Sequence, residues 1–428
     1  MNLPVADLRR HPRAMMVDPT GTRERSIRRR LCAVWYLLYF NTLTYTAGYS
    51  VVPLPSKVGK GLAQAALPLA ILLILTVNPK LKFRPNVFLS IASLLILDVV
   101  ITAAESHHVS TMFRTFRLAE FIFALWLTTP WWGRSDMLFL RATLRCLYVA
   151  LGSVVLGMFI SHHKSFAYGG RLTGAIWPML PTQVAQCSAI GAGLVIVLWL
   201  GRVLSGRAAL VGATLSVALL LLTHTRTALV GLVAGVMVAG LSIFVVNARV
   251  RKFFATLAAA VAVAIMTVAG VVTTWLARGQ STQSLTSLTG RTDYWTLVLN
   301  LPRTKIQEIF GFGLSNASVN GLPIDSNWLA AYMQEGLFGV VTCAALLVFL
   351  LVTAFFKSSG VYRAVALFLV TYTLLASFTE DSFTDVSPYL IYLAVAASLF
   401  MTTSSRPAAA SPARIAPARS RHLEEIGR

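Results

Sequence analysis

Long apolar runs alternate with short polar segments between residues 31 and 402 of the chain. Most of these runs are about 18 residues or longer, enough for an α-helix to cross the hydrocarbon core of a membrane. A soluble core would show shorter segments with helical or strand periodicity instead. Because lipid offers the backbone no partner, each run must satisfy its own hydrogen bonds as a helix. The pattern predicts an all-α, polytopic integral membrane protein.

Twelve membrane spans are predicted from the apolar runs. They cover residues 31–51, 61–77, 87–104, 118–130, 142–160, 183–200, 208–222, 227–246, 253–276, 327–356, 361–378 and 386–402. One long polar interval, residues 277–326, separates the ninth span from the tenth, and long connections between helices usually carry function. The transmembrane domain, residues 31–402, lies between a basic N-terminal segment, residues 1–30, and a tail, residues 403–428. The Pro, Ala, Ser and Arg of the tail predict that it is disordered.

The charge distribution predicts which side of the membrane each segment faces. The formal net charge is +21, and most Lys and Arg flank apolar runs, for example in NPKLKFRPN at 78–86 and NARVRK at 247–252. Basic residues are enriched in cytoplasmic segments, so both termini are predicted inside and the 277–326 interval outside. The same distribution argues against nucleic acid as a partner. Residues 1–30 are polar and basic, which predicts a retained cytoplasmic segment and not a cleaved signal.

Several arginines fall on the predicted outer side, against the orientation rule. They are Arg171, Arg226, Arg278, Arg291 and Arg303, beside the carboxylates Asp293, Asp325, Glu380, Asp381 and Asp385. Arg226 lies at a membrane edge, where it either anchors the helix end as a snorkelling side chain or holds an anionic ligand. Arg171 and Arg291 adjoin Gly and Thr, and glycine permits close approach of a ligand to the backbone. The three together match a phosphate or diphosphate clamp, which guanidinium geometry suits.

The segment GFGLSNASVNGLPIDSNWLAAYMQEGLFG at 311–339 leads from the outer interval into the tenth span. Asp325 and Ser326 open the predicted helix, and both residue types are common helix caps. Asp325 is therefore either a simple cap or a functional carboxylate. Gly336 and Gly339 share a helix face, which permits tight contact between helices.

Five motifs occur in a fixed order along the chain. They are RLTG at 171–174, HTRTALVG at 224–231, GRTDYW at 290–295, GFGLSN at 311–316 and DSNWLAAYMQEGLFG at 325–339. Together with the predicted topology, which covers most of the chain, they resemble the O-antigen ligase and O-antigen polymerase superfamily of bacterial envelope enzymes. In ligases of this superfamily the last motif begins with a histidine. Asp325 stands at that place here, with the spacing to Gly336 retained, and this departure favours the polymerase-type branch.

The resemblance implies a GT-C-like fold and a metal-independent, inverting glycosyl transfer on the extracytoplasmic face of the bacterial plasma membrane. The donor would be a polyprenyl-diphosphate-linked glycan, and the acceptor another glycan or a lipid. No cofactor is implied, and a chain-length regulator is compatible with the resemblance as a further partner. Ligase-type transfer stays open as an alternative to polymerase-type transfer.

Within this function, individual residues receive expected roles. Arg226 and Arg291 would stabilise the charge that develops on the leaving diphosphate, with Arg171 as a further binding residue. Asp325 would accept the proton of the acceptor hydroxyl or orient that hydroxyl. Asp293 is a rival for this role, or a salt-bridge partner of Arg291. The chain shows no DxD-type motif, so no metal site is predicted.

Two further residues belong to the predicted substrate-binding set. Trp295 either stacks on a sugar face or lies at the membrane–water boundary as an anchor. Asn327 follows Asp325 and Ser326 in the last motif, where it would contact substrate.

A transporter or flippase of a lipid-linked glycan is the second function class. Asp98, Glu120 and Glu335 lie at membrane depth, where ionisable side chains often mark transport pathways. Against transport, the sequence shows no evident inverted repeat, and its polar residues gather on one side of the membrane rather than at the midplane. The sequence therefore favours the transferase.

Overall fold

The computed structural model describes residues 19–106, 109–134, 137–244, 248–253, 256, 291–314, 318–319, 322–380 and 384–401. Helices dominate this part of the chain. Its two strands, β1 (Ser318–Val319) and β2 (Leu322–Pro323), form one short antiparallel hairpin. The predicted all-α class is confirmed, and six helices are long and apolar enough to cross a membrane.

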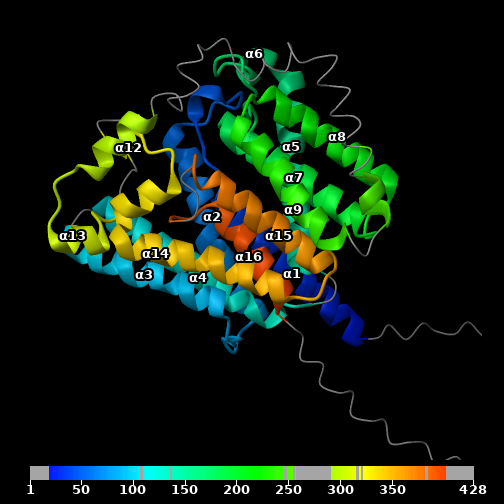
Figure 1. Ribbon diagram of the computed structural model, residues 1–428, viewed down its shortest axis with the longest axis horizontal. Coiled ribbons are helices and arrows are strands. Elements are labelled where there is room, and N and C mark those ends of the chain that lie inside the picture. The colour runs from blue at the N-terminus through cyan, green and yellow to red at the C-terminus, as the bar shows by residue number, and fades with distance from the viewer. Residues whose placement is uncertain are drawn as a thin grey trace, which may run out of the picture.

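The helices follow one another from the N-terminus as labelled in Figure 1. Their bounds are α1 (Pro19–Asn41), η1 (Ala47–Tyr49), α2 (Ser56–Val77), α3 (Val87–Ser106), α4 (Val109–Thr128), η2 (Thr129–Trp131), α5 (Leu138–Ile160), α6 (His162–Ser165), α7 (Pro181–Leu200), α8 (Gly206–Leu222), α9 (Arg226–Phe244), α12 (Arg291–Leu299), α13 (Lys305–Phe310), α14 (Asn327–Phe356), α15 (Val361–Ala376) and α16 (Pro388–Phe400).

Each predicted span other than 253–276 overlaps one of these helices. The six helices long and apolar enough to cross a membrane are α2, α3, α5, α7, α9 and α14, and α8, α15 and α16 are shorter apolar helices. The predicted span 253–276 lies almost wholly outside the described residues, as does the first part of the predicted outer interval, residues 277–290.

The first helix is shifted towards the N-terminus relative to the predicted span 31–51. Helix α1 begins at Pro19, so the basic residues 23–30 are helical, and it ends at Asn41. The Asn41 side chain donates to Ala63 O at 2.8 Å, which ties the end of α1 to α2. Thr42 Oγ1, just after the helix, donates a hydrogen bond to Tyr39 O at 2.6 Å. Apolar composition alone did not reveal this stop, because it is made by side-chain hydrogen bonds.

The long helices run between two ends of the bundle. The end called here the basic end holds the start of α1, the ends of α2, α7, α14 and α16, and the segments 78–86, 129–134 and 201–205. The opposite end, called the α6 end, holds α6 and the starts of α7, α9, α14 and α16. At the basic end Arg134 Nη2 pairs with Glu24 Oε1 at 2.6 Å, and Gly133 N donates to Ser398 O at 3.0 Å. The first and last described residues therefore lie at the same end.

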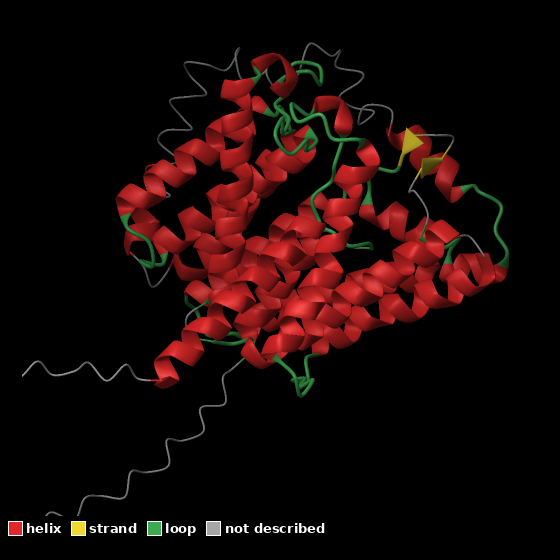
Figure 2. Cartoon of the chain, turned by 180° about the vertical axis from the view of Figure 1, so that it is seen from behind, coloured by secondary structure: helices red, strands yellow, loops and turns green. Residues whose placement is uncertain are grey.

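Helix α7 lies at the centre of one half of the molecule. Nearly all its residues are buried, and α5, α8, α9 and α15 pack around it. A helix that is apolar on every face is expected to be buried on every face. On the other side of α15 and α16, helices α3, α4 and α14 lie side by side, with α12 and α13 next to α14 (Figure 1). Figure 2 shows the same arrangement from behind, with the short hairpin at the edge of the molecule.

Three glycines form a notch between α7 and α9 that receives two aromatic rings from α15. A Cβ atom at Gly193 would lie 1.9 Å from Cζ of Phe368, and one at Gly235 would lie 2.8 Å from Cδ2 of the same ring. A Cβ atom at Gly231 would lie 2.9 Å from Cδ2 of Tyr372. Small residues at such contacts let membrane helices approach closely. The notch therefore fixes α15 against α7 and α9.

Filling the notch should destabilise the protein. We expect Gly193→Ala to cost about 1–3 kcal/mol, the usual effect of overpacking a well-packed core. Gly152→Ala is the matched control, because this α5 glycine is exposed and a Cβ atom there meets nothing within 4 Å. The control should be neutral or slightly stabilising, since alanine favours a helix over glycine by about 1 kcal/mol. Thermal unfolding of the purified variants in detergent measures both, and equal melting temperatures would contradict the notch.

Candidate functional site

The turn that follows α15, residues 377–380, joins the starts of three other helices at the α6 end. We call it the α15 turn. It is hydrogen-bonded to the starts of α14, α9 and α16. The contacts are Asn327 N to Ser377 O at 2.9 Å, Thr379 Oγ1 to Thr227 Oγ1 at 2.9 Å, and Tyr389 OH to Glu380 Oε2. Segments that lie 152 residues apart in the chain, at Thr227 and Thr379, therefore meet at one place.

Arg171 reaches this place from the connection between α5 and α7. Gly169 and Gly170 have φ values of 57° and 72°, a conformation that glycine adopts without strain, and they form the tight turn before Arg171. Arg171 Nε donates to Thr223 O at 2.9 Å, and Nη2 donates to Thr225 Oγ1 at 3.0 Å. The half-buried guanidinium is thus held against the connection between α8 and α9.

The charge of Arg171 is influenced by its surroundings at the α6 end. Burial lowers the pKa of Arg171, while the nearby Tyr168 and Glu380 act in the opposite direction. The guanidinium carbon lies 5.7 Å from the centre of the Tyr168 ring. Glu380 of the α15 turn is therefore close enough to favour the charged form of Arg171.

Arg226 is the first residue of α9 and directly follows Thr225, which accepts the hydrogen bond from Arg171. Its Nε and Nη2 atoms are buried, and no described residue accepts a hydrogen bond from either. A snorkelling arginine would place these atoms in water, so Arg226 is not a simple surface anchor. Each buried donor left without a partner costs about 1–3 kcal/mol, and more for a charged group. An anion bound beside Arg226 would supply the missing acceptors.

Asp325 lies immediately before α14. The helix cap is Ser326, whose backbone is extended and whose side chain makes no capping hydrogen bond. Asp325 precedes the cap position and is exposed, whereas Asn327 is fully buried where α14 meets the α15 turn. Because the α15 turn contacts both Asn327 and Thr227, the helix starts that carry Asp325 and Arg226 are neighbours.

Arg291, Asp293 and Trp295 lie on α12, the short helix that replaces part of the predicted outer interval. Trp295 is half-buried, while the side chains of Arg291 and Asp293 lie outside the described part of the structure. Apolar contacts of Val298 with Ile324 and Ala330 hold α12 against the start of α14.

Arg303, which the sequence analysis places with the other outer arginines, has a structural role. Its Nη1 donates to Tyr332 O at 2.8 Å and its Nη2 to Val298 O at 3.3 Å. The guanidinium carbon also lies 4.0 Å from the centre of the Tyr332 ring and 5.1 Å from that of Phe312. Arg303 therefore ties α12 to α14.

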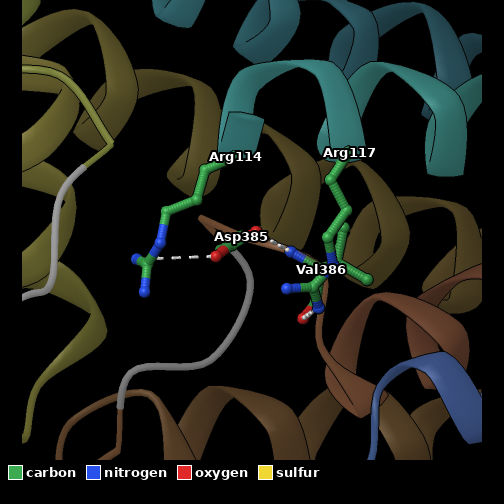
Figure 3. A network of polar contacts seen from close by, with 4 residues as sticks. All are labelled: Arg114, Arg117, Asp385 and Val386. Carbon is green, nitrogen blue, oxygen red and sulfur yellow. Dashed lines mark hydrogen bonds and ion pairs between the residues drawn. The ribbon is translucent and has the colours of Figure 1, made fainter. Parts of the chain in front are cut away.

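Two arginines that the sequence analysis left out also lie at the α6 end (Figure 3). Arg114 Nη1 is 3.7 Å from Asp385 Oδ2, and Arg117 Nη2 donates to Val386 O at 3.4 Å. Val386 N in turn donates to Asp385 Oδ1 at 2.6 Å. The predicted span 118–130 placed both arginines in a loop, but α4 begins at Val109. Their spacing of three, which puts them on one face of a helix, was the signal in the sequence.

Helix α14 has the predicted bounds, 327–356, but it is broken at Gly336, where φ is 62° and ψ is −157°. The break frees carbonyl groups at the end of the first half, as at any helix C-terminus. Phe312 N donates to Met333 O at 2.9 Å, and Gly313 N donates to Gln334 O at 2.8 Å. The GFG segment at 311–313, which belongs to the predicted outer interval, therefore caps the broken helix.

The break requires glycine at position 336. A Cβ atom there would lie 2.4 Å from the backbone of Ile309, and the positive φ strains any other L-residue. We expect Gly336→Ala to destabilise the protein by about 1–3 kcal/mol or more. Gly360→Ala, at a position without a neighbour within 4 Å, should leave the melting temperature almost unchanged. A stable Gly336→Ala protein would mean that α14 can run straight.

One buried carboxyl lies apart from the α6 end. Asp98 of α3 is fully buried, and neither of its oxygens has a hydrogen-bond partner among the residues described. Glu335, next to the break in α14, is also fully buried. Helices α3 and α14 pack on each other. As far as the structure is described, no group of three or more His, Cys, Asp or Glu side chains could hold a metal ion.

The geometry at the α6 end suits the binding of an anion. Arg171 contacts Thr225, the residue before Arg226, and exposed Asp325 lies on a neighbouring helix start. Guanidinium groups match phosphate oxygens in geometry and charge. No protein-family model matches the chain, and no curated protein matches it significantly. Function must therefore be inferred from this arrangement and from the motifs.

Proposed function

We propose that the protein is a membrane glycosyltransferase that moves a glycan from a polyprenyl-diphosphate donor onto a glycan or lipid acceptor, with polymerase-type transfer favoured. The motif resemblance supports this function class. In the proposal the α6 end faces the extracytoplasmic side of a bacterial plasma membrane and the basic end faces the cytoplasm. The gathering of the first and last described residues at the basic end supports this orientation, because basic segments stay inside.

The observation that supports the proposal most directly is the burial of two nitrogens of Arg226 without an acceptor in the described parts of the chain. Arg171 lies against the residue before Arg226. A diphosphate offers several acceptor oxygens and negative charge at the same place. Arg117 and Arg303 each have one such buried nitrogen, whereas Arg226 has two.

The chemical step requires one bond to form and one to break. The acceptor hydroxyl oxygen attacks the anomeric carbon of the donor sugar from the side opposite the diphosphate. The bond from that carbon to the phosphate oxygen breaks, and its electron pair stays on the leaving diphosphate, where Arg226 and Arg171 stabilise the charge. The hydroxyl proton passes to the carboxylate of Asp325. Arg291, on α12, is a further candidate for contact with the diphosphate.

Two alternatives remain within reach of experiment. Ligase-type transfer uses the same donor chemistry, and the glycans of a deletion strain distinguish it: unpolymerised repeats indicate a polymerase, and free polymer without its attachment indicates a ligase.

A transporter is favoured by the break in α14 together with buried Asp98, since broken helices often bind transported ions. Flux of lipid-linked glycan in proteoliposomes without a new glycosidic bond would identify it.

The proposed role of Arg226 predicts an unusual combination of effects. Arg226→Met should lower turnover by about 10²–10³-fold, the usual loss when a donor to the developing charge is removed. The melting temperature should stay the same or rise, because the variant removes buried donors that have no protein partner. Product formation by the purified protein and its thermal unfolding measure the two effects.

Two arginines serve as controls for Arg226→Met. Arg134→Met removes a guanidinium at the basic end and should leave turnover unchanged. Arg303→Met removes a guanidinium that holds α12 on α14 and should lower the melting temperature. Normal turnover of Arg226→Met would remove the main support for the transferase.

A second prediction concerns the proton acceptor. Asp325→Asn should reduce kcat by about 10²–10⁴-fold, the range for loss of a general base, with little change in KM. Glu380→Gln should leave kcat nearly unchanged, because Glu380 is assigned no proton transfer and only lies near Arg171 and accepts from Tyr389. Steady-state kinetics separate the two. If Glu380→Gln lost kcat and Asp325→Asn did not, the role of proton acceptor would move to Glu380.

A further inference from the structure

We propose that Gln186, on α7, is a further binding residue of the donor site, and that its side-chain amide donates a hydrogen bond to a phosphoryl oxygen of the donor's diphosphate. The inference rests on the proposed function and deepens it by adding a neutral donor to the two arginines. Gln186 lies inside the apolar run predicted as the span 183–200, where the sequence analysis gave it no role.

Gln186 is buried on the central helix of one half of the molecule without a use for its amide nitrogen. Only 3% of the residue is exposed, and its Nε2 atom is buried with no hydrogen-bond partner among the described residues. A side-chain amide carries two donor hydrogens on this nitrogen. An apolar residue would fit the surrounding run without leaving these donors unused, so the amide calls for an explanation.

Gln183, one helical turn earlier on α7, shows how a purely structural glutamine is held. Its Oε1 accepts from Thr44 N at 3.1 Å and from Thr44 Oγ1 at 2.7 Å, and its Nε2 donates to Thr42 O at 3.2 Å. Both ends of this amide tie α7 to the segment after α1. Within the described part of the chain, Nε2 of Gln186 makes no comparable contact.

Several arginines also have one buried nitrogen without a partner in the described residues, but they differ from Gln186. At Arg117, Arg303 and Arg363 another nitrogen of the same guanidinium donates to a backbone carbonyl. Each of these groups is therefore held in place by the protein. Gln186 has a single side-chain nitrogen, so no second donor gives it such a role.

The register of α7 places Gln186 on the face that meets α9 and α15. Gly193, seven residues further along α7, lies against the Phe368 ring of α15, which also lies against Gly235 of α9. Residues seven apart lie on nearly the same side of an α-helix, because two turns take about 7.2 residues. Gln186 therefore lies beyond the glycine notch, about 10 Å closer to the α6 end.

The same step along α9 leads to the donor site. Helices α7 and α9 both start at the α6 end, and Gly193 and Gly235 lie at the same level because they receive one ring. Seven residues before Gly235 is Ala228, which lies two residues after Arg226. On α15 the same step from the notch ends just before the α15 turn. Gln186 is therefore level with the first turn of α9, which begins with Arg226.

Arg226 and Gln186 offer donors of two kinds at this level. The buried Nε and Nη2 of Arg226 carry positive charge, whereas Nε2 of Gln186 is neutral. A diphosphate has acceptor oxygens on both of its phosphoryl groups, so the guanidinium and the amide can bind it at the same time. A neutral donor adds a contact without the desolvation cost of a further buried charge.

The test measures binding of a polyprenyl diphosphate without a sugar to the full chain in phosphatidylcholine nanodiscs. Gln186→Met should weaken binding by about tenfold or more, the usual effect of losing a hydrogen bond to a charged group. Without ligand, its melting temperature in detergent should stay the same or rise, because methionine leaves no buried donor unused. Gln183→Met is the matched control. It should lower the melting temperature and leave the affinity nearly unchanged, because its amide binds Thr42 and Thr44.

Two results would overturn the inference. Unchanged affinity of Gln186→Met for the sugar-free lipid would mean that the amide does not contact the diphosphate. A melting temperature of Gln186→Met as low as that of Gln183→Met would mean that Gln186 is structural. The proposed function is tested separately. Loss of product in Arg226→Met alongside unchanged affinity of Gln186→Met would refute only the role of Gln186. Normal product in Arg226→Met would refute the transferase and leave the binding result standing.

Discussion

The contact of Phe368 and Tyr372 with three glycines fixes how far α15 reaches through the bundle, and the rest of the α6 end depends on that position. Ser377 follows Phe368 by nine residues, or about 14 Å of helix. The α15 turn can bond to the starts of α9, α14 and α16 only if its helix ends at the right depth. A packing contact in the apolar core therefore sets the geometry of the polar site above it.

Most of the fold could be predicted from the sequence because apolar runs report where membrane helices lie. The bounds of α14 were predicted correctly, yet its break at Gly336 was not. Hydropathy does not report the backbone dihedral angles at which a helix breaks. The groups that cap the break, Phe312 and Gly313, also come more than 20 residues earlier in the chain. The end of α1 was misplaced for a related reason, since Asn41 ends the helix by bonding to α2.

The candidate site could be predicted only in part. Arg171, Arg226 and Arg291 were predicted to form one clamp, and in the structure Arg171 contacts Thr225, the residue before Arg226. Arg303 belongs to the same predicted outer set, but its two terminal nitrogens bind backbone carbonyls of α12 and α14. Residue type and segment are alike in these cases, and only tertiary contacts separate a ligand-binding arginine from a structural one. Arg114 and Arg117 were left out because the predicted start of their helix was nine residues late.

Arg226 and Asp98 are both buried ionisable residues with polar atoms that no described residue satisfies, but they make different demands on the molecule. A carboxyl group can take up a proton and become neutral, so Asp98 can exist within the bundle without any ligand. A guanidinium stays protonated in proteins and cannot relieve its burial in that way. In the proposed function a bound anion matches the charge of Arg226, whereas Asp98 can be neutral without a ligand. This difference favours chemistry on an anionic ligand at the α6 end over ion-coupled transport through the middle of the bundle.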